Sequence, residues 1–145
     1  MSIDLWGFKD VRDLEKNTSD FPEAILKEQI ALLGDKTGFV LYGKPLYMKV
    51  KNVGIEYKAA TIFDVVVPAL DDYRKTVLIM YSNLEQNFPV AISVGKSFAE
   101  DLEYFEPSYE CNNIEEFKDA LKNVLNSDDV MNVIKILYSK ANMLG

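Results

Sequence analysis

The sequence predicts an α+β fold with an N-terminal helix, an antiparallel sheet of four to five strands, and a C-terminal helical hairpin packed on one sheet face. Three observations predict it. Apolar residues recur at helical spacing in residues 22–33 and again in 114–141, β-branched and aromatic residues fill residues 37–94, and the connections between segments are short. Short connections favour antiparallel neighbours over parallel strands joined by crossover helices, and segregated helices then cover one face of the sheet.

The whole chain, residues 1–145, has the length of one ordinary domain. It contains no internal repeat, low-complexity segment or linker rich in Gly, Pro and Ser. Residues 1–19 place Trp6, Phe8 and Val11 at ragged helical spacing, which predicts either a short helix or an arm on the core. We therefore expect one globular domain whose N-terminal arm is loosely packed.

The run SDFPEAILKEQIALLGDKTG predicts a helix of about three turns. Ser19 or Asp20 is the expected N-cap, Pro22 lies in the first turn, and Gly34 is expected just past the last turn. The apolar residues between them form one stripe, which predicts a single buried face: Ile25, Leu26, Ile30 and Leu33.

The middle of the chain predicts strands. GFVLYG and LYMKVKNV read as two strands separated by a turn-like Gly43-Lys44-Pro45. In IEYKAATIFDVVVPAL one face of the predicted strand is apolar and the other carries the charged residues. Pro68 ends the strand because proline has no N–H to donate to a neighbouring strand. Near its end this strand is apolar on both faces, which leaves open the sheet face that the helices cover. One interpretation is a central strand covered on both sides, with another subunit as one candidate for the second cover. Further strands are expected at 77–81 and in FPVAISVG.

Two helices are predicted at the C-terminal end. Asn113 and Glu116 have the spacing of a capping box before an apolar stripe that begins at Ile114. Ser127 is the expected cap of the next helix, with Asp128 and Asp129 favourably placed in its first turn.

The charge and the start of the chain limit the partners and the compartment. The net charge is −7, and an acidic surface repels nucleic acids and anionic membranes, which bind through Lys and Arg. The first residues lack the basic and apolar regions of a secretory signal, and no apolar run approaches the ~20 residues of a membrane-spanning helix. We therefore expect a cytoplasmic protein that binds neither nucleic acid nor membrane.

The chain contains no histidine and one cysteine. These counts exclude Ser-His-Asp and Cys-His catalysis and any Cys/His zinc site. A site for magnesium or calcium made of carboxylates alone is a formal option, but no carboxylate spacing points to one, so we expect no cofactor. Cys111 precedes a predicted helix, where the helix dipole lowers a thiol pKa, but Glu110 and Glu115 oppose that effect. We expect an inert, half-buried cysteine, with a reactive thiol as the alternative.

Two stretches resemble phosphate-binding loops. In FPVAISVGKS the first-glycine position is Val90 and the intervening residues are strand-like, so there is no loop to surround a phosphate. In GFVLYGKP, Pro45 occupies the position where Ser or Thr would hold magnesium. We therefore predict no phosphate-binding site.

The acidic segment FAEDLEYFEPSYEC combines aromatic and carboxylate side chains. Tyrosines contribute large contact areas at interfaces, and carboxylates around them would attract a basic protein. The alternatives are that tyrosines fill the sheet and that carboxylates are solvated. The predicted binding residues are Asp101, Glu103, Tyr104, Glu106 and Tyr109.

Three segments carry a resemblance of the chain to a group of small bacterial proteins. They are FPEAILKEQIALLGDKTG, FDVVVPALDDYRKTVLIMY with FPVAISV, and the tail from NNIEEF onward. The resemblance begins near Phe21 and implies no activity or catalytic residue. Proteins of this kind are often interpreted as immunity or other protein-neutralising factors.

The first hypothesis is that this chain is a non-enzymatic acidic module that recognises another, basic protein. In the most specific form of this hypothesis the chain is an immunity protein and the partner is the protein that it neutralises. The alternatives are a small hydrolase or transferase that uses carboxylates, which requires convergent acidic residues in a pocket, and a ligand-sensing domain that works as a homo-oligomer. An open sheet edge would favour a homodimer.

Overall fold

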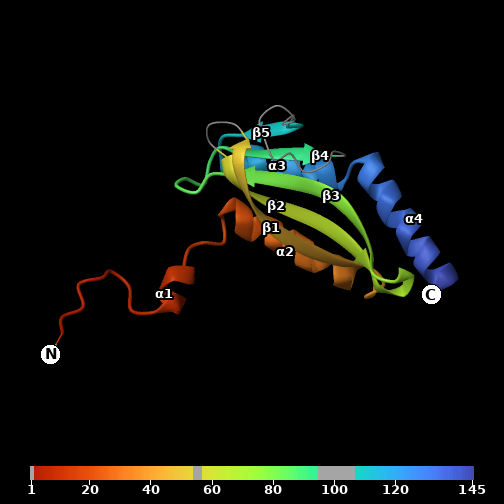
Figure 1. Cartoon of the computed structure of the whole chain (residues 1–145), viewed down its shortest axis with the longest axis horizontal. Helices are drawn as coiled ribbons and strands as arrows, with labels where there is room; N and C mark the ends of the chain where they lie inside the picture. The colour runs from red at the N-terminus through yellow and green to blue at the C-terminus, as the bar shows by residue number, and fades with distance from the viewer. Residues whose placement is uncertain (1, 54–56, 95–106) are drawn as a thin grey trace.

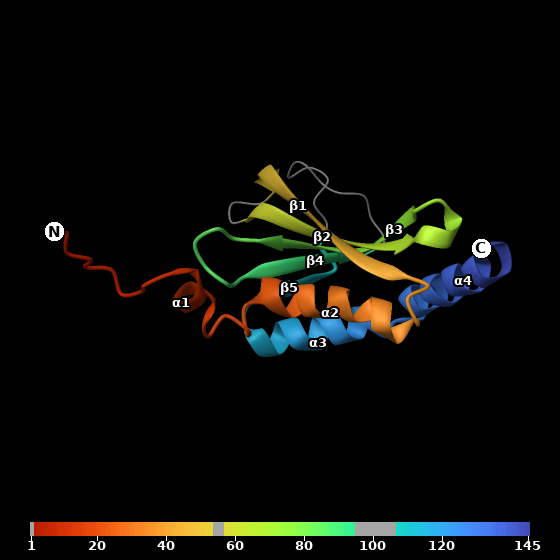
Figure 2. The same cartoon turned by 90° about the horizontal axis from the view of Figure 1, so that it is seen from below.

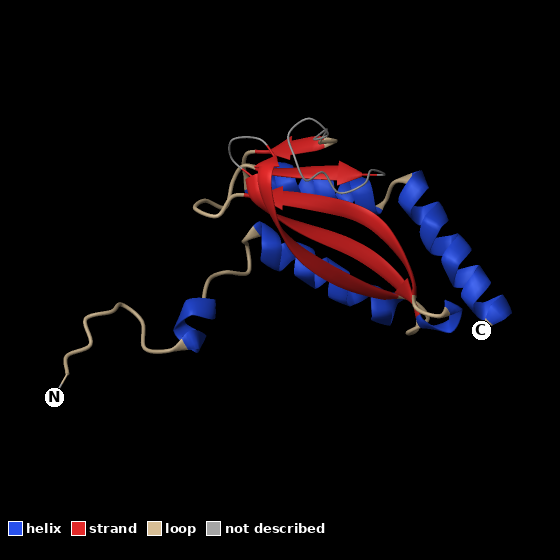
Figure 3. Ribbon diagram, viewed as in Figure 1, coloured by secondary structure: helices blue, strands red, loops and turns tan. Residues whose placement is uncertain are grey.

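The computed structural model describes residues 2–53, 57–94 and 107–145. Along the chain the elements are α1 (Val11–Glu15), α2 (Pro22–Lys36), β1 (Tyr42–Val53), β2 (Tyr57–Val67), the short 3-10 helix η1 (Pro68–Leu70), β3 (Tyr73–Ser82), β4 (Val90–Val94), β5 (Tyr109–Cys111), α3 (Ile114–Leu125) and α4 (Asp128–Leu144). Figure 1 follows them from the N-terminus to the C-terminus, and Figure 3 distinguishes helices from strands. Within the described residues, no helix is long and apolar enough to span a bilayer.

The sheet is an antiparallel meander with strand order β1-β2-β3-β4-β5. Figure 2 shows α2 and α3 side by side on the same face of this sheet, with α4 at one end. α2 contacts β1, α3 contacts β4 and β5, and α4 contacts η1 and α3. The predicted α+β fold, with a five-stranded antiparallel sheet and a C-terminal helical pair, is confirmed.

The apolar residues of the sheet lie on both of its faces. Between the sheet and the helices, Phe63, Val65 and Met80 join Leu26 and Phe117 in the larger core cluster. A second cluster of buried residues lies on the opposite face of the central strands: Val50, Tyr57, Ala60, Ile62, Ile79, Tyr81 and Ala91. The expectation that the strand ending in ATIFDVVV is central and buried on both sides is therefore confirmed, since β2 is buried from Ala60 to Val67.

The first predicted strands are partly wrong. The chain turns at residues 37–41, where Gly38 and Phe39 have left-handed φ angles of 61° and 66°. The side chain of Thr37 stabilises this turn, because its hydroxyl accepts the Leu41 N–H at 3.1 Å. Gly43-Lys44-Pro45 is not a turn but part of the continuous strand β1, in which Pro45 pairs with Phe63. β1 is an edge strand, and an edge is where a sheet tolerates proline.

Both predicted ends of α2 are also wrong. Phe21, not Ser19 or Asp20, occupies the N-cap position, and it provides no side-chain hydrogen bond. Gly34 lies inside the helix rather than past its end. The ring of Tyr42 packs beside it, and a Cβ added at Gly34 would lie 3.4 Å from Tyr42 Cδ1. Pro22 begins the helix as predicted.

The predicted caps of the C-terminal helices are confirmed. Asn113 Oδ1 accepts the Glu116 N–H at 2.9 Å, and Glu116 reaches back to the backbone of Asn112 rather than that of Asn113. Ser127 Oγ accepts the Val130 N–H at 3.3 Å. These caps satisfy N–H groups that the first turn of a helix leaves without a partner.

The N-terminal arm, residues 2–18, extends away from the rest of the chain (Figure 1). Its helix α1 buries no residue. Local hydrogen bonds hold it: Asp10 Oδ1 accepts the Arg12 N–H at 2.9 Å, and Asp13 Oδ2 accepts the Lys9 N–H at 2.7 Å. The latter bond, together with Lys16, lowers the pKa of the Asp13 carboxyl below its usual value.

Candidate functional site

The placement of α2 and α3 leaves an open channel above the middle of the sheet. α2 lies on β1 and α3 on β4 and β5. Since neighbouring strands are about 4.8 Å apart, β1 is separated from β4 and β5 by about 14 to 19 Å. Helices in contact lie only about 8 to 10 Å apart, so about 5 to 10 Å remains between the two helices. We name this channel the interhelical groove.

The interhelical groove consists of two adjoining hollows of about 470 Å³ each. Gln29, Leu125 and Asn126 line both hollows, so the two hollows adjoin at these residues. The first opens at the start of α2, where its lining includes Ser19 and Asp20. The second continues toward the start of α4. It is lined mainly by apolar side chains: Leu32, Leu33, Phe63, Val77, Leu125, Val130, Met131 and Ile134.

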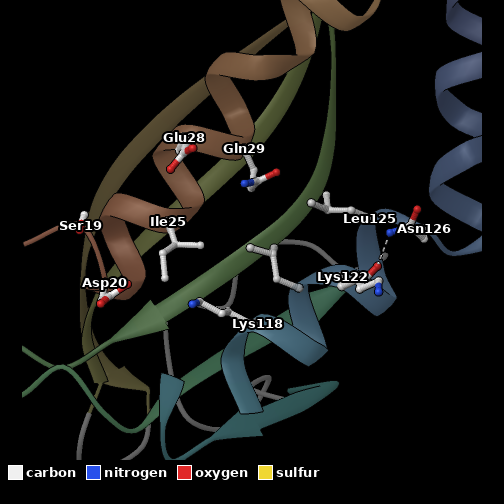
Figure 4. Close-up of a pocket in the computed structure, with 10 residues that line it drawn as sticks. Ser19, Asp20, Ile25, Glu28, Gln29, Lys118, Lys122, Leu125 and Asn126 are labelled. Carbon is white, nitrogen blue, oxygen red and sulfur yellow. Dashed lines mark hydrogen bonds between the residues drawn. The ribbon is translucent and has the colours of Figure 1, made fainter. Parts of the chain in front are cut away.

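The two walls of the first hollow have opposite charges. Asp20 and Glu28 belong to the α2 wall, and Lys118 and Lys122 to the α3 wall. Figure 4 shows Lys118 extending from α3 toward the α2 side, with Ile25 and Leu125 between the walls. Within the described residues the two ion pairs are Lys16–Asp13 and Arg74–Asp64, so no ion pair crosses the groove. The charged groups on both walls are exposed to solvent and to whatever enters the groove.

The second hollow exposes apolar surface. Leu32 on α2 is 37% exposed and Met131 on α4 is 38% exposed, although both line a concave site. Grouped apolar exposure of this kind marks surfaces that proteins use to bind one another. The groove therefore combines an apolar floor with charged rims, which is the general composition of a protein-binding site.

Of the predicted binding residues, Asp101, Glu103, Tyr104 and Glu106 lie outside the described residues. Tyr109 is described: it belongs to β5, the short edge strand that the sequence did not predict, and it is 36% exposed. The first phosphate-loop resemblance is described in part: Val90–Val94 forms the strand β4, as the strand-like residues predicted, whereas Gly95, Lys96 and Ser97 lie outside the described residues.

The second phosphate-loop resemblance is described, and it has no phosphate-binding geometry. Gly38 belongs to the turn after α2, whereas Gly43 and Lys44 belong to β1. A phosphate site of this type requires a helix to begin directly after the loop, so that backbone N–H groups surround the anion. Here a twelve-residue strand follows instead.

Cys111 is buried among apolar residues of the larger core cluster. Burial, followed by the nearby Glu116 carboxylate, raises the pKa of its thiol to about 11. The thiolate is the nucleophilic form, so this cysteine is unreactive at neutral pH. It is more deeply buried than the sequence predicted.

A buried carboxylate that the sequence analysis did not single out lies on the sheet face opposite the helices. Asp64 on β2 is paired with Thr76 on β3, whose hydroxyl donates to Asp64 Oδ1 at 2.6 Å. Arg74 Nε lies 3.4 Å from Asp64 Oδ2. Because both carboxylate oxygens have partners, this group is a satisfied structural element.

Acidic residues do not form a metal site in the part of the chain that the structure describes, since no group of three or more potential ligands occurs there. The interhelical groove contains the carboxylates of Asp20 and Glu28, but they lie on one wall and point apart in Figure 4. Asp20 precedes α2 and Glu28 lies in its second turn, which separates them by more than about 9 Å along the helix.

Comparison with protein-family models, curated proteins and solved structures finds no match. The groove and its residues are therefore interpreted from their own geometry and chemistry.

The sequence analysis missed the groove, although α2 contained a signal for it. The apolar residues of α2 cover more of the helix than one packed face requires: Leu26 and Ile30 are buried, while Ile25 and Leu33 are half-buried and Leu32 is exposed. The three residues that are not buried line the groove. An apolar surplus next to a narrow buried stripe indicates a second contact surface.

Proposed function

We propose that this protein is a non-enzymatic module that binds a polypeptide segment of another protein molecule in the interhelical groove. The observation that supports this function best is the pair of adjoining hollows, one lined mainly by apolar side chains and the other by charges of both signs that form no ion pair among the described residues.

The dimensions of the groove favour an extended segment. The ~5 to 10 Å between α2 and α3 is narrower than a helix with its side chains, which is about 10 to 12 Å wide. The length available beside the fifteen residues of α2 is about 22 Å, which corresponds to roughly seven extended residues. A small-molecule pocket encloses most of its ligand, whereas this channel lies open beside exposed lysine and glutamate side chains.

The charges of the groove favour a partner segment that contains both signs. Acidic residues of the partner would face Lys118 and Lys122, and basic residues would face Asp20 and Glu28. The net charge of −7 adds a long-range attraction for a partner that is basic as a whole. Neutralising a basic protein, the role of an immunity protein, is one specific form of this proposal.

Affinity capture with single-residue variants tests the proposed site. The full chain, Met131→Lys and Met143→Lys serve as bait in lysate of the cells that produce the protein. Met131 lines the groove, whereas Met143 lies on the same helix, is 67% exposed and does not line it. We expect a polypeptide that the wild type and Met143→Lys retain and that Met131→Lys releases. Capture that is the same for all three baits would overturn the proposal.

A further inference from the structure

The N-terminal arm exposes more large apolar side chains than a short solvated segment requires. Ile3, Leu5 and Trp6 precede α1, and Trp6 is 77% exposed. Val11 and Leu14 on α1 are exposed as well. A helix of five residues is marginal without packing, and exposed tryptophan and leucine side chains are typical of segments that dock on a protein surface.

Hydrogen bonds in the link between α1 and α2 direct the arm away from its own groove. Thr18 Oγ1 donates to the Glu15 carbonyl at 2.9 Å, and the Phe21 N–H donates to the Thr18 carbonyl at 3.0 Å. Asn17 adopts a left-handed φ of 61° in this link. Figures 1 and 2 show the arm continuing outward past the end of the helices. Entry into its own groove would require the chain to reverse direction between residues 9 and 19.

The arm has the dimensions of a groove occupant. Residues 2–9 form no helix or strand, and eight extended residues reach at most about 26 Å, against ~22 Å of groove beside α2. An extended backbone is also the form that the narrow gap between α2 and α3 admits.

The arm also has matching chemistry. Ile3 and Leu5 lie on the same side of an extended segment and provide apolar groups for the hollow lined by Leu32 and Met131, while Trp6 lies on the other side. Asp4 is complementary to the lysines of the α3 wall, and Lys9 to the carboxylates of the α2 wall.

We infer that the groove of one molecule receives residues 2–9 of a second copy, so that two chains exchange arms across a twofold axis. This inference rests on the proposed function, because it assigns the occupant of the same groove. The segment that enters the groove is neutral, since residues 2–9 contain one carboxylate, Asp4, and one ammonium group, Lys9, whereas the net charge of −7 on each copy opposes their association. A twofold exchange fills both grooves and leaves neither arm exposed, which closes the assembly at two chains.

Trp6 makes the exchange measurable, because it is the one tryptophan of the chain. The full-length protein is examined from low to high micromolar concentration by sedimentation equilibrium and by tryptophan emission. We expect the mass to rise from 16.5 kDa toward twice that value, with a blue shift of the emission over the same concentration range. Burial of the indole in the groove of the second copy produces the shift.

Two pairs of variants locate the contact. Leu5→Asp alters the arm, and its control Leu84→Asp alters a residue in the β3–β4 connection that is similarly exposed. Met131→Lys alters the groove, and its control is Met143→Lys. We expect Leu5→Asp and Met131→Lys each to weaken dimerisation at least about tenfold, while both controls leave it unchanged.

A chain that stays monomeric with Trp6 exposed at every concentration would overturn the inference. A monomer whose Trp6 is shielded at every concentration would overturn it too, because its arm would then occupy its own groove. A dimer insensitive to Leu5→Asp and Met131→Lys would also overturn it. The proposed function is tested separately, by capture of a different polypeptide that Met131→Lys releases. Failure of this inference and failure of the proposed function are therefore distinguishable.

Discussion

Asp64 is a buried carboxylate that depends on its partners Thr76 and Arg74. Its carboxylate is buried on the sheet and accepts the Thr76 hydroxyl at 2.6 Å. Thr76→Val keeps the shape of the side chain but removes the donor, so we expect a loss of about 1 to 3 kcal/mol in the free energy of unfolding. Urea denaturation measures it. Thr76→Ser retains the hydroxyl and should lose less, and equal losses in the two variants would show that the hydrogen bond contributes little.

Cys111 gives a prediction about pH. Its thiol has a pKa of about 11 in the folded chain against an ordinary value of 9.0, because burial opposes ionisation. Below pH 9 the thiol is protonated in both the folded and the unfolded chain. Between pH 9 and 11 only the unfolded chain releases the proton, so the free energy of unfolding decreases as pH rises through this window.

The comparison that isolates this effect uses Cys111→Ala, which has no thiol to titrate. We expect wild type to lose more stability than Cys111→Ala between pH 9 and 11, measured by urea denaturation at each pH. Parallel pH profiles would contradict the assignment. Alkylation of the native thiol at neutral pH should also be slow, and it should become fast in denaturant.

At the scale of elements, the contact of α2 with β1 depends on a glycine. A Cβ at Gly43 would collide with the backbone carbonyl oxygen of Ile30 and would lie 2.9 Å from Ile30 Cγ2. Because a backbone oxygen cannot rotate away, Gly43→Ala must displace α2 from the sheet. We expect a loss of about 1 to 3 kcal/mol in the free energy of unfolding.

Thermal and urea unfolding of Gly43→Ala measure that loss. Gly7→Ala is the matched control, since nothing lies within 4 Å of a Cβ at that position. A Gly43→Ala variant as stable as this control would show that α2 and β1 are less closely packed than described.

The elements that sequence patterns predicted well are those with strong local chemistry. Asn113 and Ser127 are caps whose hydrogen bonds involve residues three positions away, so sequence alone could identify them. The predictions for Gly34 and Gly43 were wrong because the roles of these glycines depend on residues that are distant in the sequence. Both glycines were interpreted as turn or end signals, but Gly43 allows close packing of β1 against Ile30 of α2, and Gly34 lies in the helix beside the ring of Tyr42. Contacts between distant segments leave no local pattern.

At the scale of the whole molecule, the fold class followed from the order of the segments, whereas the candidate site did not. The groove exists because α2 and α3 lie near opposite edges of the same sheet face, and that face is too wide for two helices to cover. Strand order and helix placement determine that gap, and neither is encoded in a short motif. Lys118, Met131 and Glu28 are ordinary surface residues in the sequence, and only the fold brings them to one groove.

The central claim, that the interhelical groove binds a polypeptide segment, is tested most directly by site-specific photo-crosslinking. A photoreactive amino acid replaces Met131 in the groove or, as the control, Met143 outside it. After irradiation in the cells that produce the protein, we predict a crosslinked polypeptide from position 131 and none from position 143. Mass spectrometry then identifies the occupant, and a crosslink to residues 2–9 of a second copy would confirm arm exchange. Equal crosslinking from both positions, or none from position 131, would contradict the account.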